Sequence, residues 1–198
     1  MQAVVGISDH CGWAECITVG VRDNAPLVLD RRRATLIAPG LPGTPYHHEG
    51  LELPLADAEK LINRVRQSIV EHTQAALSEL RSSHGIGAVV LQESPFERLP
   101  DSLAEVLTSW RLTCAADGMM YREALADCAA ELGMEVIRYP RKSDEIATAA
   151  AEHGAARETV AAVVLALGRE LGPPWRKEHQ NAAAAALRVV ARRTNLQW

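Results

Sequence analysis

The chain has 198 residues, of which 47% are hydrophobic and 23% are charged, and its formal net charge at pH 7 is -4. These values exclude a disordered polypeptide and indicate one globular domain, 1–198, with a sizeable core. Proteins that bind nucleic acid usually carry a basic face, so the net charge weighs against such a partner without excluding one. The arginine-rich segments at 31–33, 176–177 and 188–193 are interpreted as solvated edges of hairpins and helices.

The cysteines and the apolar segments predict a cytoplasmic protein. None of the four cysteines belongs to a C-x-x-C pair, and residues 1–7 are too short and too strand-like for a signal peptide. The longest strongly apolar run, residues 160–167, is far shorter than a membrane-spanning helix. We therefore expect reduced thiols and no association with a membrane. Cys11 and Cys16 could join His10 in a metal site, but ordinary buried thiols are the simpler interpretation.

Three consecutive antiparallel strands are predicted at the N-terminus. Residues 3–7 form a short apolar run, and two β-rich runs, 16–21 and 27–37, flank a turn that contains Asp, Asn and Pro. Such a turn between β-rich runs is a hairpin signal. Residues 38–50 hold three prolines and three glycines, which predict a long loop. Loops of this length in a compact domain are often functional.

Helices and strands then alternate. Apolar residues at helical spacing predict an amphipathic helix over 55–80, which Gly85 and Gly87 end. The apolar run 86–91 predicts a strand buried on both faces, in a parallel position in the sheet. Ser102 and Glu105 have the spacing of a capping box and predict that a helix begins there.

The last third of the chain is predicted to be mostly helical. A fifth strand is expected at 134–139, after Gly133. Pro174 is expected in the first turn of the final helix, where proline is tolerated. The helices after residue 101 are expected at 102–112, 116–132, 143–152, 157–171 and 174–193.

Short motifs at the two ends of the chain resemble those of a known superfamily. Residues 4–9 read Val-Val-Gly-Ile-Ser-Asp, and residues 178–187 join Glu178 and Asn181 to an Ala/Leu-rich stretch. Together with the order of elements, these motifs resemble the ribonuclease H-like superfamily and, within it, the Holliday-junction resolvase branch. The resemblance implies an α/β fold with a mixed five-stranded sheet, three antiparallel N-terminal strands plus two parallel strands, flanked by helices.

The motifs depart from the pattern of that branch at two positions. The branch has Gly-Ile-Asp in its first strand, but here Ser8 follows Gly-Ile and Asp9 comes one residue later. Because side chains alternate along a strand, this shift turns the carboxylate to the other face of the sheet unless a bulge corrects it. The branch has two acids three residues apart on its final helix, where this chain has Glu178 and the uncharged Asn181. Glu93 matches the central carboxylate of the branch.

The resemblance implies metal-dependent hydrolysis of a phosphodiester in DNA or RNA. Two divalent ions activate the attacking water and stabilise the leaving oxygen in such a reaction. Mg²⁺ and Mn²⁺ prefer oxygen ligands, so Asp9, Glu93 and Glu178 are predicted metal ligands and, with Asn181, predicted catalytic residues. Each also has a structural interpretation: a turn cap for Asp9, a solvated strand end for Glu93, and the positive end of a helix for Glu178 and Asn181.

Histidines form a second set of candidates. The loop residues His47 and His48, with His10 or Asp9 nearby, could bind Zn²⁺ or another transition metal. A loop histidine could also act as a general base, because its pKa lies near neutrality. Exposed histidines without a function are the simpler interpretation, and the same holds for His179.

Three functions remain open at this point, and geometry separates them. A metal-dependent nuclease requires Asp9, Glu93 and Glu178 to converge on one point. A non-catalytic ribonuclease H-like domain, serving in binding or as a scaffold, is favoured when Asp9 points away from Glu93. A different metal-dependent hydrolase requires the loop with His47 and His48 to cover the same cleft. By analogy with the resolvase branch, the chain could form a homodimer.

Overall fold

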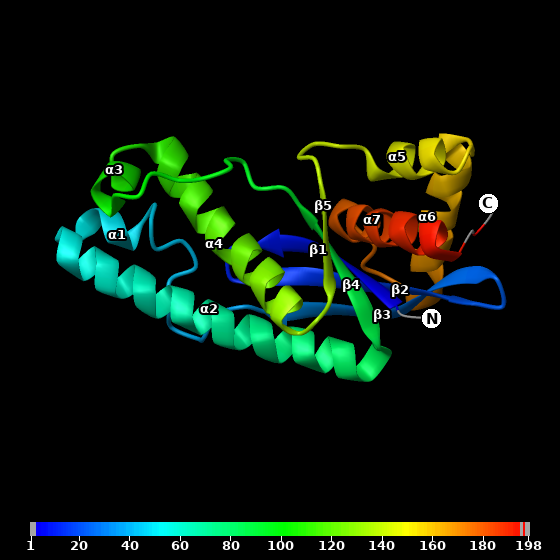
Figure 1. Ribbon diagram of the computed structural model, residues 1–198, viewed down its shortest axis with the longest axis horizontal. Helices are drawn as coiled ribbons and strands as arrows, with labels where there is room; N and C mark the ends of the chain where they lie inside the picture. The colour runs from blue at the N-terminus through cyan, green and yellow to red at the C-terminus, as the bar shows by residue number, and fades with distance from the viewer. Residues whose placement is uncertain (1–2, 195, 197–198) are drawn as a thin grey trace.

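The computed structural model describes residues 3–194 and 196, and its strands form one mixed sheet with the order β3-β2-β1-β4-β5 (Figure 1). The first three strands are antiparallel neighbours, whereas β4 runs parallel to β1 and β5 runs parallel to β4. This arrangement confirms the predicted mixed sheet. The strands are β1 (Ala3–His10), β2 (Trp13–Arg22), β3 (Ala25–Thr35), β4 (Ile86–Gln92) and β5 (Glu135–Tyr139).

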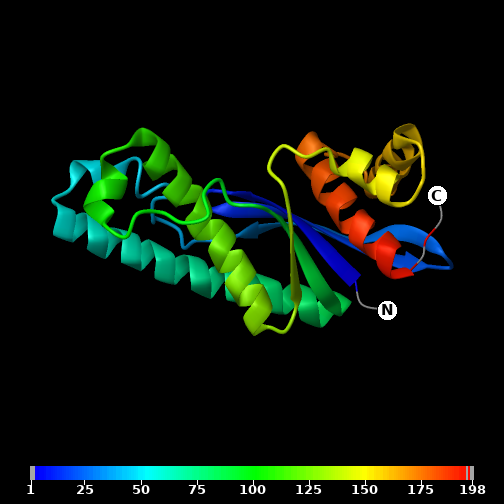
Figure 2. The same cartoon turned by 45° about the horizontal axis from the view of Figure 1, so that its top comes forward.

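Helices cover both faces of this sheet. Figures 1 and 2 show α2 and α4 on one face and α7, with α5 and α6 beside it, on the other. None of the described helices combines the length and the apolarity needed to cross a lipid bilayer. The described residues form α1 (Glu49–Glu52), α2 (Leu55–His84), α3 (Leu103–Leu107), α4 (Trp110–Glu131), α5 (Glu145–Glu152), α6 (Arg157–Leu171) and α7 (Lys177–Thr194).

Two apolar clusters, one on each side of the sheet, make up most of the core. On the α4 side, Val5 and Ile7 of β1 pack in one cluster with apolar residues of α2 and α4. On the α7 side, Val4 packs with Val90 of β4 and with the alanines of α7. Successive residues of a strand point to opposite faces, which is why neighbours in β1 belong to different clusters.

A close approach of α7 to β1 depends on small residues. The five alanines from Ala182 to Ala186 are fully or almost fully buried. Gly6 of β1 lies beneath them, and a Cβ atom placed on it would come within 1.9 Å of the backbone oxygen of Ala182. The missing side chain at Gly6 therefore sets the distance between α7 and the sheet.

Three sequence-based boundaries were wrong. Ser102 makes no side-chain capping hydrogen bond, and α3 ends at Leu107. The next helix, α4, already begins at Trp110, because the buried Thr113 and Asp117 occupy positions that face the core without adding to an apolar pattern. Pro174 lies outside α7, whose first turn starts at Lys177.

Candidate functional site

The direction of the β1 side chains decides what the site can contain. The register between β1 and β2 is continuous from Val4 opposite Val19 to His10 opposite Trp13, so no bulge interrupts this end of β1. Val5 and Ile7 point to the α4 side, and Asp9 follows the same alternation. Ser8 and His10 therefore point to the α7 side, and the one-residue shift in the motif is not corrected.

Asp9 forms a bidentate ion pair with Arg122 of α4. The Nη2 and Nε atoms of Arg122 donate to the two carboxylate oxygens of Asp9 over 2.6 Å and 3.2 Å. Both side chains are buried, with 8% of Arg122 and 7% of Asp9 exposed. Bidentate contacts of this kind are among the strongest that a carboxylate makes. The pair fixes α4 to β1 and neutralises Asp9.

Glu93 lies directly beyond β4 and is exposed. Its backbone N–H donates to the carbonyl of Tyr139 over 2.8 Å, and its carbonyl accepts a hydrogen bond from Nη1 of Arg122 over 3.2 Å. The same guanidinium thus contacts Asp9 and Glu93, but it reaches Glu93 only through the backbone. Within the described residues, the Glu93 carboxylate has no hydrogen-bond or ion-pair partner.

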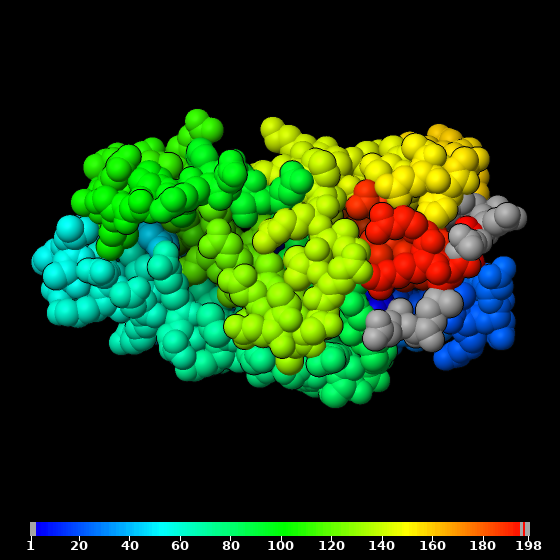
Figure 3. Space-filling model, in the orientation of Figure 1, coloured from blue at the N-terminus to red at the C-terminus, as the bar shows by residue number. Residues whose placement is uncertain are grey.

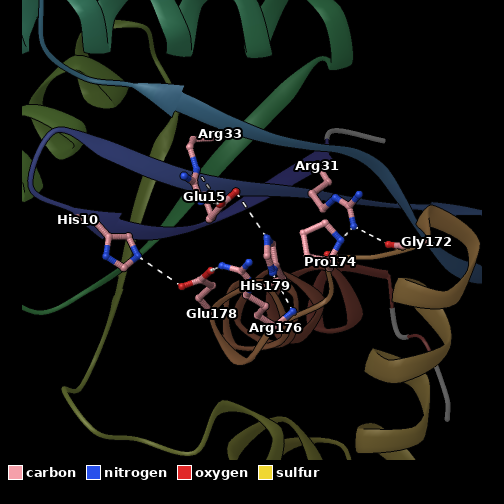
Figure 4. Close-up of polar contacts among 9 residues, drawn as sticks. All are labelled: His10, Glu15, Arg31, Arg33, Gly172, Pro174, Arg176, Glu178 and His179. Atoms are coloured by element: carbon pink, nitrogen blue, oxygen red, sulfur yellow. Dashed lines mark hydrogen bonds and ion pairs between the residues drawn. The ribbon is translucent and has the colours of Figure 1, made fainter. Parts of the chain in front are cut away.

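Three other candidate ligands, His10, Glu178 and His179, lie on the α7 side of the sheet (Figure 4). Glu178 and His179 lie in the first turn of α7. The Nε2 atom of His10 lies 3.8 Å from a Glu178 oxygen, and the Nε2 atom of His179 lies 3.6 Å from an oxygen of Glu15 in β2. Glu15, Glu178 and His179 each offer a ligand atom within 4.8 Å of the others. These three residues form an acidic cluster that could hold a metal ion.

Hydrogen bonds already occupy two members of this cluster. The Nδ1 atom of His179 accepts the backbone N–H of Arg176 over 2.9 Å, so the proton of a neutral ring lies on Nε2, facing Glu15. One oxygen of Glu15 accepts two hydrogen bonds from Arg33. Glu178, 24% exposed, has weaker contacts, with His10 and Arg176 at 3.8 Å and 4.0 Å from its oxygens. With Asp9 on the opposite side, the residues present do not fit a pair of divalent ions.

A groove of about 680 Å³ lies on the α7 side, beyond the carboxyl ends of β4 and β5. Gln92 and Asn181 both line it, so neutral amides occupy this part of the site. Because Gly6 is opposite Val90 in the parallel pair, the next residues of β1 and β4 that point to that face are Ser8 and Gln92. In Figure 3, α5, which forms one wall, lies directly beside α7.

The charged side chains of this groove leave it locally basic. Lys142 and Lys177, two of the chain's three lysines, line it and are exposed. Its two acids are held by internal contacts: Asp144 caps α5 and pairs with Arg157, while Glu145 accepts from Ser143 and lies 3.4 Å from Arg188. Sequence reasoning missed Lys142, which belongs to no motif, and interpreted Lys177 only as part of a solvated basic segment.

The predicted basic segment 31–33 contacts the residues that precede α7. Arg31 donates to the carbonyls of Gly172 and Pro174 over 2.8 Å and 2.7 Å (Figure 4). It is half-buried and ties β3 to the segment before α7, so its interpretation as a solvated edge was wrong.

The loop with His47 and His48 lies against α4, away from the groove. Backbone N–H groups of Tyr46 and His47 donate to the buried carboxylate of Asp117 in α4, over 3.0 Å and 3.2 Å. The His47 ring contacts His48 and the edge of Trp110. His10 lies on the other side of the sheet, so the structure does not bring the three histidines together.

The free energy of unfolding should carry a pH dependence from Asp117. Burial raises the pKa of this carboxyl from 3.8 to about 6. Between these values the folded protein binds more protons than the unfolded chain, so raising the pH over this range lowers stability. Urea denaturation of the wild type and of Asp117→Asn across this range should show the stability of the wild type falling relative to the variant. A constant difference would contradict this assignment.

Comparison with known proteins identifies the architecture. The chain matches no family model, and no curated protein matches it significantly. A structure of RuvC from Thermus thermophilus in complex with a Holliday junction substrate shares 18% identity, with a TM-score of 0.54, over 99% of this chain and 98% of that one. A second T. thermophilus RuvC structure shares 20% identity, with a TM-score of 0.56, over 98% of both chains. The chain therefore has the fold of these RuvC structures, which confirms the expected ribonuclease H-like fold.

Proposed function

We propose that this chain is a ribonuclease H-like domain that binds nucleic acid in the groove beside α7 and does not cleave it. The observation that carries the proposal is the buried ion pair between Asp9 and Arg122. A two-ion mechanism needs carboxylates that converge on both ions. Here Asp9 is neutralised on the α4 side, while Glu178 lies on the α7 side. The proposal takes up the non-catalytic alternative raised by the sequence.

The chemistry of the groove supports binding to a phosphate backbone. Lys142 and Lys177 offer positive charge, and Gln92 and Asn181 offer amide groups that can donate hydrogen bonds. Phosphate contacts from such groups give affinity that depends on salt and little on sequence. The net charge of -4 is an average over the whole chain and does not describe this groove.

Branched DNA is the first ligand to test, because the similar RuvC structure holds a Holliday junction substrate. Fluorescence anisotropy with a labelled four-way junction and a duplex should detect binding that weakens as salt rises. The slope of log K against log salt is negative. In the Lys142→Gln/Lys177→Gln variant, we expect the magnitude of this slope to decrease by about 2, roughly one unit for each lost phosphate contact.

Lys60→Gln is the matched control for this experiment, because Lys60 is an exposed lysine on α2, outside the groove. It should bind DNA as the wild type does. If the double variant also keeps the wild-type slope, nucleic acid does not bind in this groove. The homodimer that the resemblance implies stays a prediction, and light scattering on the same protein measures it.

Metal-dependent cleavage is the second candidate, favoured by the acidic cluster of Glu15, Glu178 and His179. Incubating the junction with the protein and Mg²⁺ or Mn²⁺ tests it. We expect intact DNA under conditions in which anisotropy shows binding. Cleavage that Glu178→Gln abolishes would overturn the non-catalytic proposal and place the ion at Glu178. Loss of cleavage in Glu93→Gln would instead support the site predicted from the sequence.

A further inference from the structure

A second pocket, of about 250 Å³, lies on the α4 side of the sheet and shares no lining residue with the groove beside α7. Phe96 and Arg141 reach it from the segments that follow β4 and β5, and α4 supplies the opposite wall. Ligands of open α/β sheets bind outside the carboxyl ends of the strands, which is where this pocket lies. Three arginines line it, so we call it the arginine pocket: Arg111, Arg122 and Arg141.

Two of the three arginines of the arginine pocket have no carboxylate partner within the described residues. Asp9 offsets the charge of Arg122. Arg111 is exposed and lies over the ring of Phe96, the only phenylalanine of the chain, 4.9 Å from its centroid. Arg141 is also exposed, and no ion pair within the described residues joins either arginine to a carboxylate. Two guanidinium charges are thus available to a ligand.

Gly118 gives an independent reason to expect a ligand. It lies in the middle of α4, where glycine costs about 0.5–1 kcal/mol relative to alanine. Packing does not require it, because no atom of the described residues outside the neighbouring turns of α4 lies within 4 Å of a Cβ atom placed on it. The residue lines the arginine pocket, and its missing side chain keeps that space open. A residue that lowers the stability of its helix and that packing does not require is typical of a functional position.

We propose that the arginine pocket binds the dianion of a phosphate monoester. The two available guanidinium charges match a monoester, which carries about -1.5 to -2 at pH 7, better than a backbone diester with a single charge. Guanidinium groups also match phosphate oxygens in geometry. The monoester could be the terminal phosphate of a nucleic-acid strand or a free phosphorylated small molecule. The site does not depend on the groove beside α7.

The test compares strands that differ only in the terminal phosphate. Single-stranded oligonucleotides with a 5′-phosphate or a 5′-hydroxyl, labelled at the 3′ end, are titrated with the protein by anisotropy. Inorganic phosphate and a nucleoside 5′-monophosphate are titrated separately by calorimetry. We expect the 5′-phosphate to raise affinity about tenfold or more, or the small phosphates to bind directly. A preference confined to the oligonucleotide identifies a strand end, and direct binding of the monophosphate identifies a small ligand.

Three variants locate the site. Arg111→Gln and Arg141→Gln should each abolish most of the phosphate-dependent binding. Gly118→Leu should abolish it by filling the pocket, and leucine favours a helix, so α4 should stay folded by circular dichroism. Arg64→Gln, an exposed arginine of α2 outside the pocket, should have no effect. The proposal is overturned if phosphate gives no gain with any probe, or if the gain survives in Gly118→Leu. Loss of junction binding in the lysine variant would not affect it.

Discussion

Replacing Arg122 by Met is expected to lower the free energy of unfolding by about 3–5 kcal/mol. Methionine keeps much of the side-chain volume of arginine but leaves the carboxylate of Asp9 buried without a partner. It also removes the hydrogen bond to the carbonyl of Glu93. A buried charge without compensation is among the few causes of so large a loss. Urea denaturation at neutral pH, followed by circular dichroism, measures the effect.

A double variant separates the lost ion pair from lost packing. Asp9→Asn combined with Arg122→Met removes the unpaired charge, so it should be clearly more stable than Arg122→Met alone. Arg64→Met on the surface of α2 should stay within about 0.5 kcal/mol of the wild type. If Arg122→Met lost less than about 1 kcal/mol, Asp9 would not depend on Arg122, and the main argument against a metal at Asp9 would fail.

Replacing Gly6 by Ala is expected to destabilise the protein by about 3 kcal/mol or more, because the new methyl group meets the backbone of α7. The added Cβ atom would lie 1.9 Å from the oxygen of Ala182, and a helix backbone cannot rotate aside as a side chain can. Relief requires α7 to move away from β1, which separates the buried alanines from the sheet. Thermal unfolding measures the loss.

Gly118→Ala is the matched control, because its added Cβ atom meets nothing within 4 Å. Alanine is the better helix former, so this variant should be about 0.5–1 kcal/mol more stable than the wild type. The two glycine substitutions should therefore shift the midpoint of unfolding in opposite directions. Equal stability of Gly6→Ala and the wild type would mean that α7 does not pack on β1 at this distance.

The order of elements could be predicted because it depends on local patterns. The hairpin turn between β2 and β3, the long amphipathic α2 and the apolar β4 each follow from residues close in sequence. Gly85 ends α2 in the left-handed conformation, with φ of 61°, as its place after the apolar pattern indicated. The start of α4 could not be predicted from the apolar pattern, because the polar residues Thr113 and Asp117 occupy core positions.

The partners of the candidate residues could not be predicted in the same way. Arg122 and Asp9 are 113 residues apart in sequence, and nothing local marks one as the partner of the other. α4 contains two arginines, Arg111 and Arg122, and its sequence does not distinguish the one that pairs with Asp9. Lys142 and Gln92 were missed because a search for acids and histidines passes over neutral and basic residues. Alternation along β1 predicted that the one-residue shift turns Asp9 to the other face of the sheet unless a bulge corrects it, and the structure has no bulge between Val4 and His10.

Few substitutions would turn the uncharged side chains on the sheet face beneath α7 into carboxylates. Gln92 and Asn181 are isosteres of glutamate and aspartate, differing only by an amino group in place of an oxygen, and Ser8 points to the same face of the sheet. Carboxylates at these three positions would join Glu178 on one side of the sheet. Three side-chain exchanges, with the backbone unmoved, would therefore place four acids on this side of the sheet.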